Sequence, residues 1–256
     1  MTSPTITVAS YNMRKAIGID RQRRPDRVLH VLQEIDADIV ALQEADKRFG
    51  TRASAVPHGL IDSHGLYKPV EFGIGHSRFA HSIPFGERIE TMLGLDTRNL
   101  GWHGNAILVK RDIEVTGYEA LDLPTLEPRG AVIAELDVRG HPLRIVGMHL
   151  DLSGLWRRRQ VRAILDHIAR RHAPMPTVLM GDTNEWRAAK GCLDEFRHGG
   201  FSIADTGNSF HARRPVAPLD RIIVDNRLTI AAAGVHSSAE SRKASDHLPI
   251  WARLEF

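Results

Sequence analysis

Apolar positions along the chain fall into short runs separated by polar or glycine-containing stretches. Residues Thr5 to Tyr11 are β-prone and alternate, which predicts a first strand. Pro25 suits the first position of a helix. The apolar residues that follow have the spacing of one helical stripe: Val28, Val31, Leu32 and Ile35. Asp38 to Leu42 then predicts a short buried strand, so the chain opens as strand, helix, strand.

The middle and the end of the chain predict more strands and two more helices. Residues 131–138 and 142–150 have the pattern of a hairpin. Leu155 to His172 predicts the clearest helix, and Glu185 to His198 predicts another. The other expected strands are 71–85, 105–110, 113–121, 176–180, 219–224, 228–233 and 248–254. Two stretches show neither period and are expected to be loops: 50–69 and 86–101.

Helices separate some of these strands, whereas hairpins separate others. This mixture favours two packed sheets with helices outside over one parallel sheet. No Gly-rich dinucleotide fingerprint follows the first strand, and no Walker-type lysine motif occurs. No repeat, low-complexity tract or linker interrupts the sequence. We therefore predict an α/β fold that forms a single domain over residues 1–256.

The composition is that of an ordinary globular protein. The 256 residues are 42% hydrophobic and 25% charged, so the chain has enough apolar side chains to form a core without disulfides or structural metals. The net charge of +3 is only a weak indication of an anionic partner. The one cysteine, Cys192, cannot form an internal disulfide, and we expect it to be buried. We find no signal peptide and no run of about 20 apolar residues, so we expect a cytoplasmic protein without a transmembrane segment.

Polar side chains stand where several apolar runs begin or end. Five groups share this position: Asn12, Glu44, His149 with Asp151, Asp182 with Asn184, and Asp246 with His247. A side chain at the end of a strand lies at the edge of the sheet, and the strand holds it in a fixed position. Carboxylate, amide and imidazole groups together suit the activation of a water beside a metal-bound phosphate. The sequence therefore predicts a divalent-metal-dependent phosphoester hydrolase.

These residues belong to short sequence motifs, here called words, that are spread over nearly the whole chain. The words are Ser10-Tyr11-Asn12, Leu42-Gln43-Glu44, Gly104-Asn105-Ala106, Met148-His149-Leu150, Gly181-Asp182-Thr183-Asn184, Leu219-Asp220-Arg221-Ile222 and Ser245-Asp246-His247-Leu248-Pro249. In these words and their order the chain resembles the endonuclease/exonuclease/phosphatase superfamily. Its members include deoxyribonuclease I, exonuclease III-type abasic endonucleases, neutral sphingomyelinases and inositol polyphosphate 5-phosphatases. The resemblance implies a four-layer α/β sandwich, with two packed mixed β-sheets flanked by helices and a site at one edge.

The resemblance also implies metal and water-activating roles. Glu44 is the expected principal metal ligand, with Asn12 and Asp246 beside it. Hard oxygen ligands favour Mg²⁺, with Mn²⁺ as the alternative. Asp182 is expected to orient or deprotonate the attacking water, and Asn184 to bind that water or a phosphoryl oxygen. The alternative is that the Asp-x-Asn word caps the helix expected from Glu185.

Two histidines complete the catalytic set that the resemblance implies. His247 is expected to contact the phosphate, with Asp220 holding its other ring nitrogen. The alternative for Asp220 is an ion pair with its neighbour Arg221. His149 is expected to bind the phosphate or assist the leaving oxygen, and Glu71 is a candidate for its carboxylate partner.

The substrate is less well defined than the chemistry. Asn105 and Arg129 are candidate phosphate-binding residues, with turn and surface roles as the alternatives. Four arginines begin the clearest helix and either bind a phosphate backbone or form a solvated face: Arg157, Arg158, Arg159 and Arg162. The word around His149 resembles deoxyribonuclease I and the sphingomyelinases more than the abasic endonucleases.

We therefore expect a monomeric nuclease, endonuclease or exonuclease, or another phosphodiesterase, with DNA or RNA as candidate substrate. A phosphatase or phosphodiesterase acting on a phospholipid headgroup or a small phosphorylated molecule is the alternative. A catalytically silent binding protein is the third possibility, but the Asp-x-Asn and Asp-His words are both intact.

Overall fold

The computed structural model describes residues 4–46, 54–72, 100–125, 129–171, 174–187 and 190–256, and within them the strands form two six-stranded sheets. The first sheet has the order β11 (Thr229–Val235), β12 (Ile250–Glu255), β1 (Thr5–Asn12), β2 (Ile39–Gln43), β4 (Ala106–Lys110) and β3 (Tyr67–Pro69). The second has the order β5 (Glu114–Asp122), β6 (Gly130–Val138), β7 (His141–His149), β8 (Thr177–Asp182), β10 (Asp220–Asp225) and β9 (Phe201–Ile203). Both sheets are mixed, because the pairs β1–β2 and β7–β8 are parallel while their outer neighbours are antiparallel.

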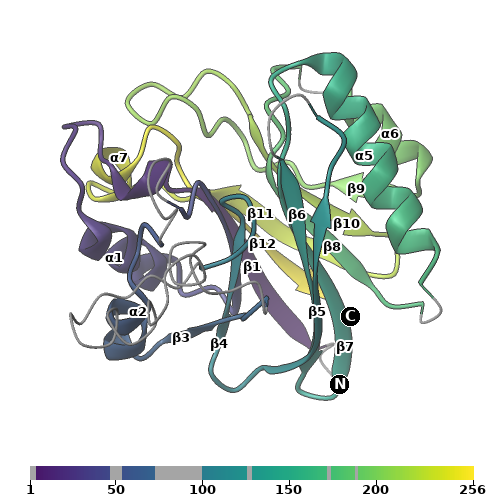
Figure 1. Cartoon of the computed structure of the whole chain (residues 1–256), viewed down its shortest axis with the longest axis horizontal. Helices are drawn as coiled ribbons and strands as arrows, with labels where there is room; N and C mark the ends of the chain where they lie inside the picture. The colour runs from purple at the N-terminus through teal and green to yellow at the C-terminus, as the bar shows by residue number, and fades with distance from the viewer. Residues whose placement is uncertain (1–3, 47–53, 73–99, 126–128, 172–173, 188–189) are drawn as a thin grey trace, which may run out of the picture.

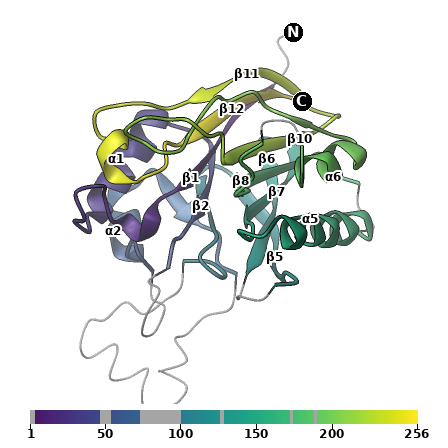
Figure 2. The same cartoon turned by 90° about the horizontal axis from the view of Figure 1, so that it is seen from above.

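Helices cover the outer faces of both sheets (Figures 1 and 2). The side of the first sheet carries α1 (Pro25–Ile35), α2 (His58–His64) and α7 (Ser241–Ala244), and a 3-10 turn, η1 (Arg14–Ala16), follows β1. The second sheet is covered by α5 (Gly154–Ala169) and α6 (Leu193–His198). The predicted four-layer α/β sandwich is confirmed. None of the helices in the described part of the chain is long and apolar enough to cross a membrane.

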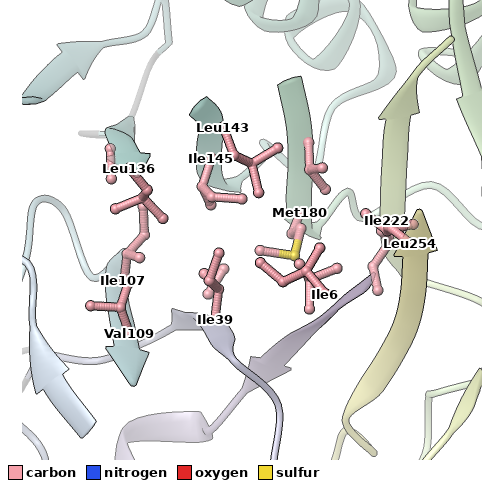
Figure 3. Close-up of a cluster of buried hydrophobic side chains, with 14 of the residues drawn as sticks. Ile6, Ile39, Ile107, Val109, Leu136, Leu143, Ile145, Met180, Ile222 and Leu254 are labelled. Atoms are coloured by element: carbon pink, nitrogen blue, oxygen red, sulfur yellow. The ribbon is translucent and has the colours of Figure 1, made fainter. Parts of the chain in front are cut away.

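Alternation along the central strands explains why the sequence reads as continuous apolar runs. In β2, Ile39 and Ala41 face the second sheet, whereas Val40 and Leu42 face α1. Successive side chains of a strand point to opposite faces, so a strand covered on both sides needs apolar residues at every position. Figure 3 shows the layer between the sheets, with Ile6, Ile39 and Ile107 on one side and Leu136, Ile145 and Met180 on the other.

Most of the elements predicted within the described residues are confirmed, and two differ. Residues 50–69, expected to be a loop, contain α2 and β3. In the segment Glu185 to His198, expected to be one helix, the described residues are helical only in α6. The Glu185 carboxylate accepts hydrogen bonds from the backbone amides of Arg187 and Cys192, which holds the segment before α6 as a loop. Cys192 is buried, as expected. Most of the strand expected at 71–85 and of the loop expected at 86–101 lies outside the described residues.

Candidate active site

Strand directions bring the predicted functional residues to one edge of the sandwich. The carboxyl ends of β1, β2, β7 and β8 meet there with the amino ends of the antiparallel strands β10 and β12. The register places His149 beside Asp182, and Asp182 opposite Asp220. The residues at these ends are Asn12, Glu44, His149, Asp182, Asp220 and, just before β12, Asp246 and His247. Asn105 and Arg129 precede β4 and β6 at the same edge.

The Asp182 carboxylate lies at the centre of this edge and is only 2% exposed. Asn12 Nδ2 donates to Asp182 Oδ2 at 3.0 Å. The Nε2 atoms of His149 and His247 lie 3.6 and 3.7 Å from the same oxygen. The other oxygen, Oδ1, accepts from the backbone amide of Asn184 at 2.8 Å. The carboxylate is therefore held in one orientation between two imidazoles.

Asn184 closes a tight turn rather than beginning a helix. Its φ of 48° is left-handed, and its side-chain Nδ2 donates to the carbonyl oxygen of Leu150 at 2.9 Å. Because the next residues form a loop, the helix-capping interpretation of the Asp-x-Asn word is wrong. The hydrogen bond to Leu150 instead joins the loops that follow β8 and β7.

A second carboxylate, that of Asp220, contacts the His247 ring nitrogen that faces away from Asp182. His247 Nδ1 lies 2.8 Å from Asp220 Oδ2, and Ser209 Oγ donates to the same oxygen. Asp220 is fully buried. The Arg221 guanidinium donates to the backbone carbonyl of Asp220 and not to its carboxylate, so the alternative ion pair between these neighbours is wrong. Asp220 thus orients the imidazole so that Nε2 faces Asp182.

The two histidines have opposite charge preferences although they are equally close to Asp182. Burial lowers the pKa of His247, but the carboxylates of Asp220, Asp182 and Asp246 outweigh it and raise the pKa to about 10. Burial lowers the pKa of His149 and Arg129 lowers it further, and together they outweigh the opposite effects of Asp182 and Glu44. At neutral pH, His247 is therefore a cation and His149 is neutral.

Asp182 Oδ2 lies 3.6 Å from His149 Nε2, and Glu71 as the carboxylate partner of His149 stays a prediction. Glu71 is an exposed residue that follows β3. Arg129 acts on His149 electrostatically, which places this predicted phosphate-binding residue beside the site. Asn105 differs, because its Nδ2 donates to the carbonyl of Gly130 at 2.9 Å and joins the starts of β4 and β6. That bond is the one expected of a turn residue.

Two basic residues that the sequence reasoning missed neutralise the outer carboxylates. Lys15 Nζ forms an ion pair with Glu44 Oε2, and Arg14 Nε lies 3.3 Å from Asp246 Oδ2. Burial raises the pKa of Glu44, but Lys15 and the two site histidines outweigh it and lower the pKa. Both basic residues belong to η1, directly after Asn12. The signal available in the sequence was the pair of basic residues, Arg14 and Lys15, that begins two residues after the predicted ligand Asn12.

The predicted metal ligands supply the oxygen chemistry that a hard divalent cation needs. Glu44 offers a carboxylate, which pairs with Lys15 in the structure. Asp246 offers a second carboxylate at the same edge, which pairs with Arg14. Asn12 Oδ1 accepts one hydrogen bond, from the Arg14 amide at 3.1 Å, and a carbonyl oxygen has a second lone pair. These donors fit Mg²⁺ or Mn²⁺.

A different group has the tightest clustering of ligand-type atoms. Among the described residues, one ligand atom each of Asp182, Asp220 and His247 lie within 4.8 Å of one another. His247 Nδ1 and Ser209 Oγ both lie against Asp220 Oδ2, so hydrogen bonds account for the close approach of these atoms. We therefore interpret the trio as a hydrogen-bonded group beside the predicted metal ligands.

Aromatic rings pack against the same edge. The Phe210 ring lies 4.9 Å from the His247 ring, between ring centroids, and Trp186 packs edge-on against Phe210 at 5.9 Å. Sequence reasoning missed both residues, because they stand in irregular segments without periodicity. Their only sequence signal was proximity to Asn184 and Asp220.

A two-sheet α/β sandwich with buried carboxylates and imidazoles at one edge defines the class of the protein as a hydrolase of phosphoric esters. Residues 9–247 match the model of the Endonuclease/Exonuclease/phosphatase family, and the chain belongs to that family. Comparison with curated protein sequences finds no match. The predictions of the family and of a phosphoester hydrolase are confirmed.

Solved structures with the same fold share little sequence with this chain. An endonuclease/exonuclease/phosphatase family protein from Bacteroides thetaiotaomicron is 19% identical, with a TM-score of 0.74 over 100% of this chain and 96% of that one. The mannosyl-6-phosphatase of B. thetaiotaomicron VPI-5482 is 19% identical, with a TM-score of 0.71 and coverages of 98% and 100%. TDP2 from C. elegans is 17% identical, with a TM-score of 0.67 and coverages of 98% and 75%. At these identities the similarity shows the fold.

Proposed function

We propose that the protein is a divalent-metal-dependent phosphodiesterase that hydrolyses its substrate by in-line attack of a water molecule. One observation carries the proposal, namely the Asp182 carboxylate held between Asn12, His149 and His247, with Asp220 behind His247. General bases need this kind of fixed orientation at the reacting atoms.

Each residue has a role that follows from its position. Asp182 accepts the proton of the attacking water, and Asn12 and the Asn184 amide hold its two oxygens in one orientation. His247, a cation, donates through Nε2 to a phosphoryl oxygen and stabilises the negative charge that grows there. His149, which is neutral, binds the phosphate or assists the leaving oxygen. Arg129 supplies a further positive charge on the phosphate side.

Glu44, Asn12 and Asp246 would hold the metal ion. When bound, Mg²⁺ or Mn²⁺ supplies positive charge that neutralises the phosphate and the leaving oxygen. Lys15 and Arg14 neutralise two of these carboxylates in the structure, so metal binding requires their side chains to move aside.

Cleavage of supercoiled plasmid, bis(p-nitrophenyl) phosphate and a phosphomonoester, each with Mg²⁺ and with EDTA, tests the proposal. We expect diester hydrolysis that both EDTA and Asp182→Asn remove. Loss of a general base lowers kcat about 10²- to 10⁴-fold. The matched control is Asp194→Asn, a partly exposed residue of α6. Unchanged turnover in Asp182→Asn would contradict the proposal.

The substrates separate the remaining alternatives. Plasmid nicking would identify a nuclease, whereas hydrolysis of small esters with intact plasmid would indicate a lipid headgroup or a small phosphate. Preference for the phosphomonoester would match the activity named for the B. thetaiotaomicron mannosyl-6-phosphatase. No turnover of any substrate with either metal would support the catalytically silent binding protein.

A further inference from the structure

Large exposed apolar side chains gather around the site. Among the described residues, five large hydrophobic side chains are strongly exposed, and four of them stand in the first turn of α5 or in loops that adjoin the catalytic edge. These four form what we call the apolar rim: Leu152 (75% exposed), Leu155 (58%), Trp186 (60%) and Val216 (63%). The fifth, Tyr118, lies on β5.

Contacts join the first two loops of the rim. The loop after β7 carries Leu152, whose carbonyl accepts from Arg157 Nη1 at 2.6 Å. Arg157 Nη2 in turn donates to Glu185 at 3.1 Å, directly before Trp186. The start of α5 and the loop after β8 are therefore fixed against each other. Figure 1 shows α5 beginning at the edge where the segment before β10 also lies.

The third loop is joined to the second through aromatic packing. Trp186 packs on Phe210, and the carbonyl of Phe210 accepts from the backbone amide of Val216 at 2.7 Å. Phe210 also packs on the His247 ring. The apolar rim is thus continuous through these contacts and reaches the catalytic histidine.

Residues 152–159, 184–187 and 210–217, which carry the rim, expose positive charge. Their exposed basic residues are Arg158, Arg159, Arg187, Arg213 and Arg214. Within residues 152–159, 184–187 and 210–217 the acidic residue is Glu185, which is 4% exposed and paired with the buried Arg157. Exposed single hydrophobic residues are common, but a contiguous apolar patch bordered by basic residues marks a contact surface.

We propose that the apolar rim docks the protein on the surface of an anionic phospholipid bilayer. Apolar side chains enter the headgroup region while neighbouring arginines bind lipid phosphates, and both contributions add to affinity. Three of the four rim residues are aliphatic and lack the ring face that stacks on nucleic-acid bases. Docking in this orientation turns Asp182 and His247 toward lipid phosphodiesters. The proposal rests on the exposed surface and not on the proposed catalysis.

Flotation with vesicles tests the docking in EDTA, so that no turnover is needed. We expect binding to vesicles of phosphatidylcholine mixed with phosphatidylglycerol and much weaker binding to phosphatidylcholine alone. Leu152→Ser with Trp186→Ser should weaken binding on the order of tenfold or more, given the apolar area of these side chains. Arg213→Gln with Arg214→Gln should weaken it by a similar factor, because each basic residue near an anionic surface adds about a fivefold effect.

Tyr118→Ser is the matched control, because it removes an equally exposed hydrophobic residue that lies outside the rim. It should bind vesicles as the unaltered protein does. Thermal unfolding of each variant shows whether it is folded. Three outcomes would overturn the proposal: no vesicle binding, equal loss in the Tyr118 variant, or binding to a single-stranded oligonucleotide that the rim variants lose while vesicles do not compete. Loss of hydrolysis with vesicle binding retained would instead contradict only the proposed catalysis.

Discussion

At the scale of single residues, the site depends on which side chain stands behind each catalytic group. His149 and His247 are equally near Asp182, and His247 Nδ1 also lies 2.8 Å from the Asp220 carboxylate. Burial lowers the pKa of both rings, but Asp220 and the other nearby carboxylates reverse this effect for His247. Neighbouring titratable groups with opposite environments are the usual basis of a division of roles in catalysis.

Asp220→Asn tests this arrangement. The amide keeps the shape of the side chain but removes the charge that orients and charges His247. We expect kcat to fall about 10²- to 10⁴-fold, as when the supporting carboxylate of a catalytic histidine is lost. Ser209→Ala is the control, because it removes the two hydrogen bonds between the Ser209 hydroxyl and Asp220 and keeps the bond from Asp220 to His247. Steady-state kinetics should show less than about a tenfold loss for Ser209→Ala, given about 1 kcal/mol for a hydrogen bond. Equal effects of the two changes would contradict the orienting role.

The arginines at the start of α5 divide into structural and exposed residues. Arg157 is 8% exposed and paired with the buried Glu185, and Arg162 pairs with Glu195. The hypothesis that all four bind a phosphate backbone is therefore wrong for Arg157. Arg157→Leu should lower the free energy of unfolding by about 3–5 kcal/mol, because it leaves Glu185 buried without its partner.

The neighbouring Arg158→Leu is the matched control for that change. Its side chain is exposed, and we expect a change within about 0.5 kcal/mol. Urea unfolding of both variants measures the difference. Similar stability of the two variants would show that the Arg157–Glu185 pair does not stabilise the fold.

At the scale of elements, ion pairs attach α5 to the second sheet. Glu135 of β6 accepts from Arg144 of β7 at 2.9 Å and from Arg171, which follows α5. Burial raises the pKa of Glu135, but the bonds from Arg144 and Arg171 outweigh it and lower the pKa below its ordinary value of 4.5. A carboxyl group with a lowered pKa stabilises the fold fully above its unfolded pKa, and this contribution is lost as the pH falls through the folded pKa.

Glu135→Gln should therefore destabilise the protein at neutral pH and make it less sensitive to acid. We expect a loss of about 1.5–3 kcal/mol, the range for hydrogen bonds to charged groups. Urea unfolding at several values between about pH 3 and 7 measures the effect. The exposed Glu114→Gln on β5 should leave the curve unchanged. A Glu135 variant with the same acid dependence as the unaltered protein would contradict the assignment.

At the scale of the whole molecule, the site exists because two sheets meet at one edge. Glu44, Asn12 and Asp246 come from the first sheet and its connections, while Asp182, His149 and Asp220 come from the second. The apolar layer between the sheets holds these two groups in register (Figure 3). A metal ion held by Glu44, as proposed, would therefore stabilise the native state and not the unfolded chain.

Thermal unfolding with Mg²⁺ or Mn²⁺ should report this binding without any assay of activity. At a metal concentration about 100 times the dissociation constant, the native state gains about 2.7 kcal/mol. Glu44→Gln should remove the metal-dependent rise in Tm. Glu255→Gln, at the opposite edge of the same sheet, should keep it. A rise that survives in the Glu44 variant would place the metal elsewhere.

The sequence by itself determined the strands, the main helices and the family, because alternating and helical spacings are local and the site words are short and contiguous. It missed α2 and extended α6 too far, since Gly59 weakens the helical signal and the Glu185 carboxylate binds backbone amides instead of starting a helix.

Tertiary structure alone decided the pairings across the site. The pairs of Lys15 with Glu44, Ser209 with Asp220, and Asp182 with His149 are contacts between segments distant in sequence or between loops without periodicity. The opposite charges of the two histidines depend on burial and on which carboxylates lie nearby, and both are set by the packing of the two sheets.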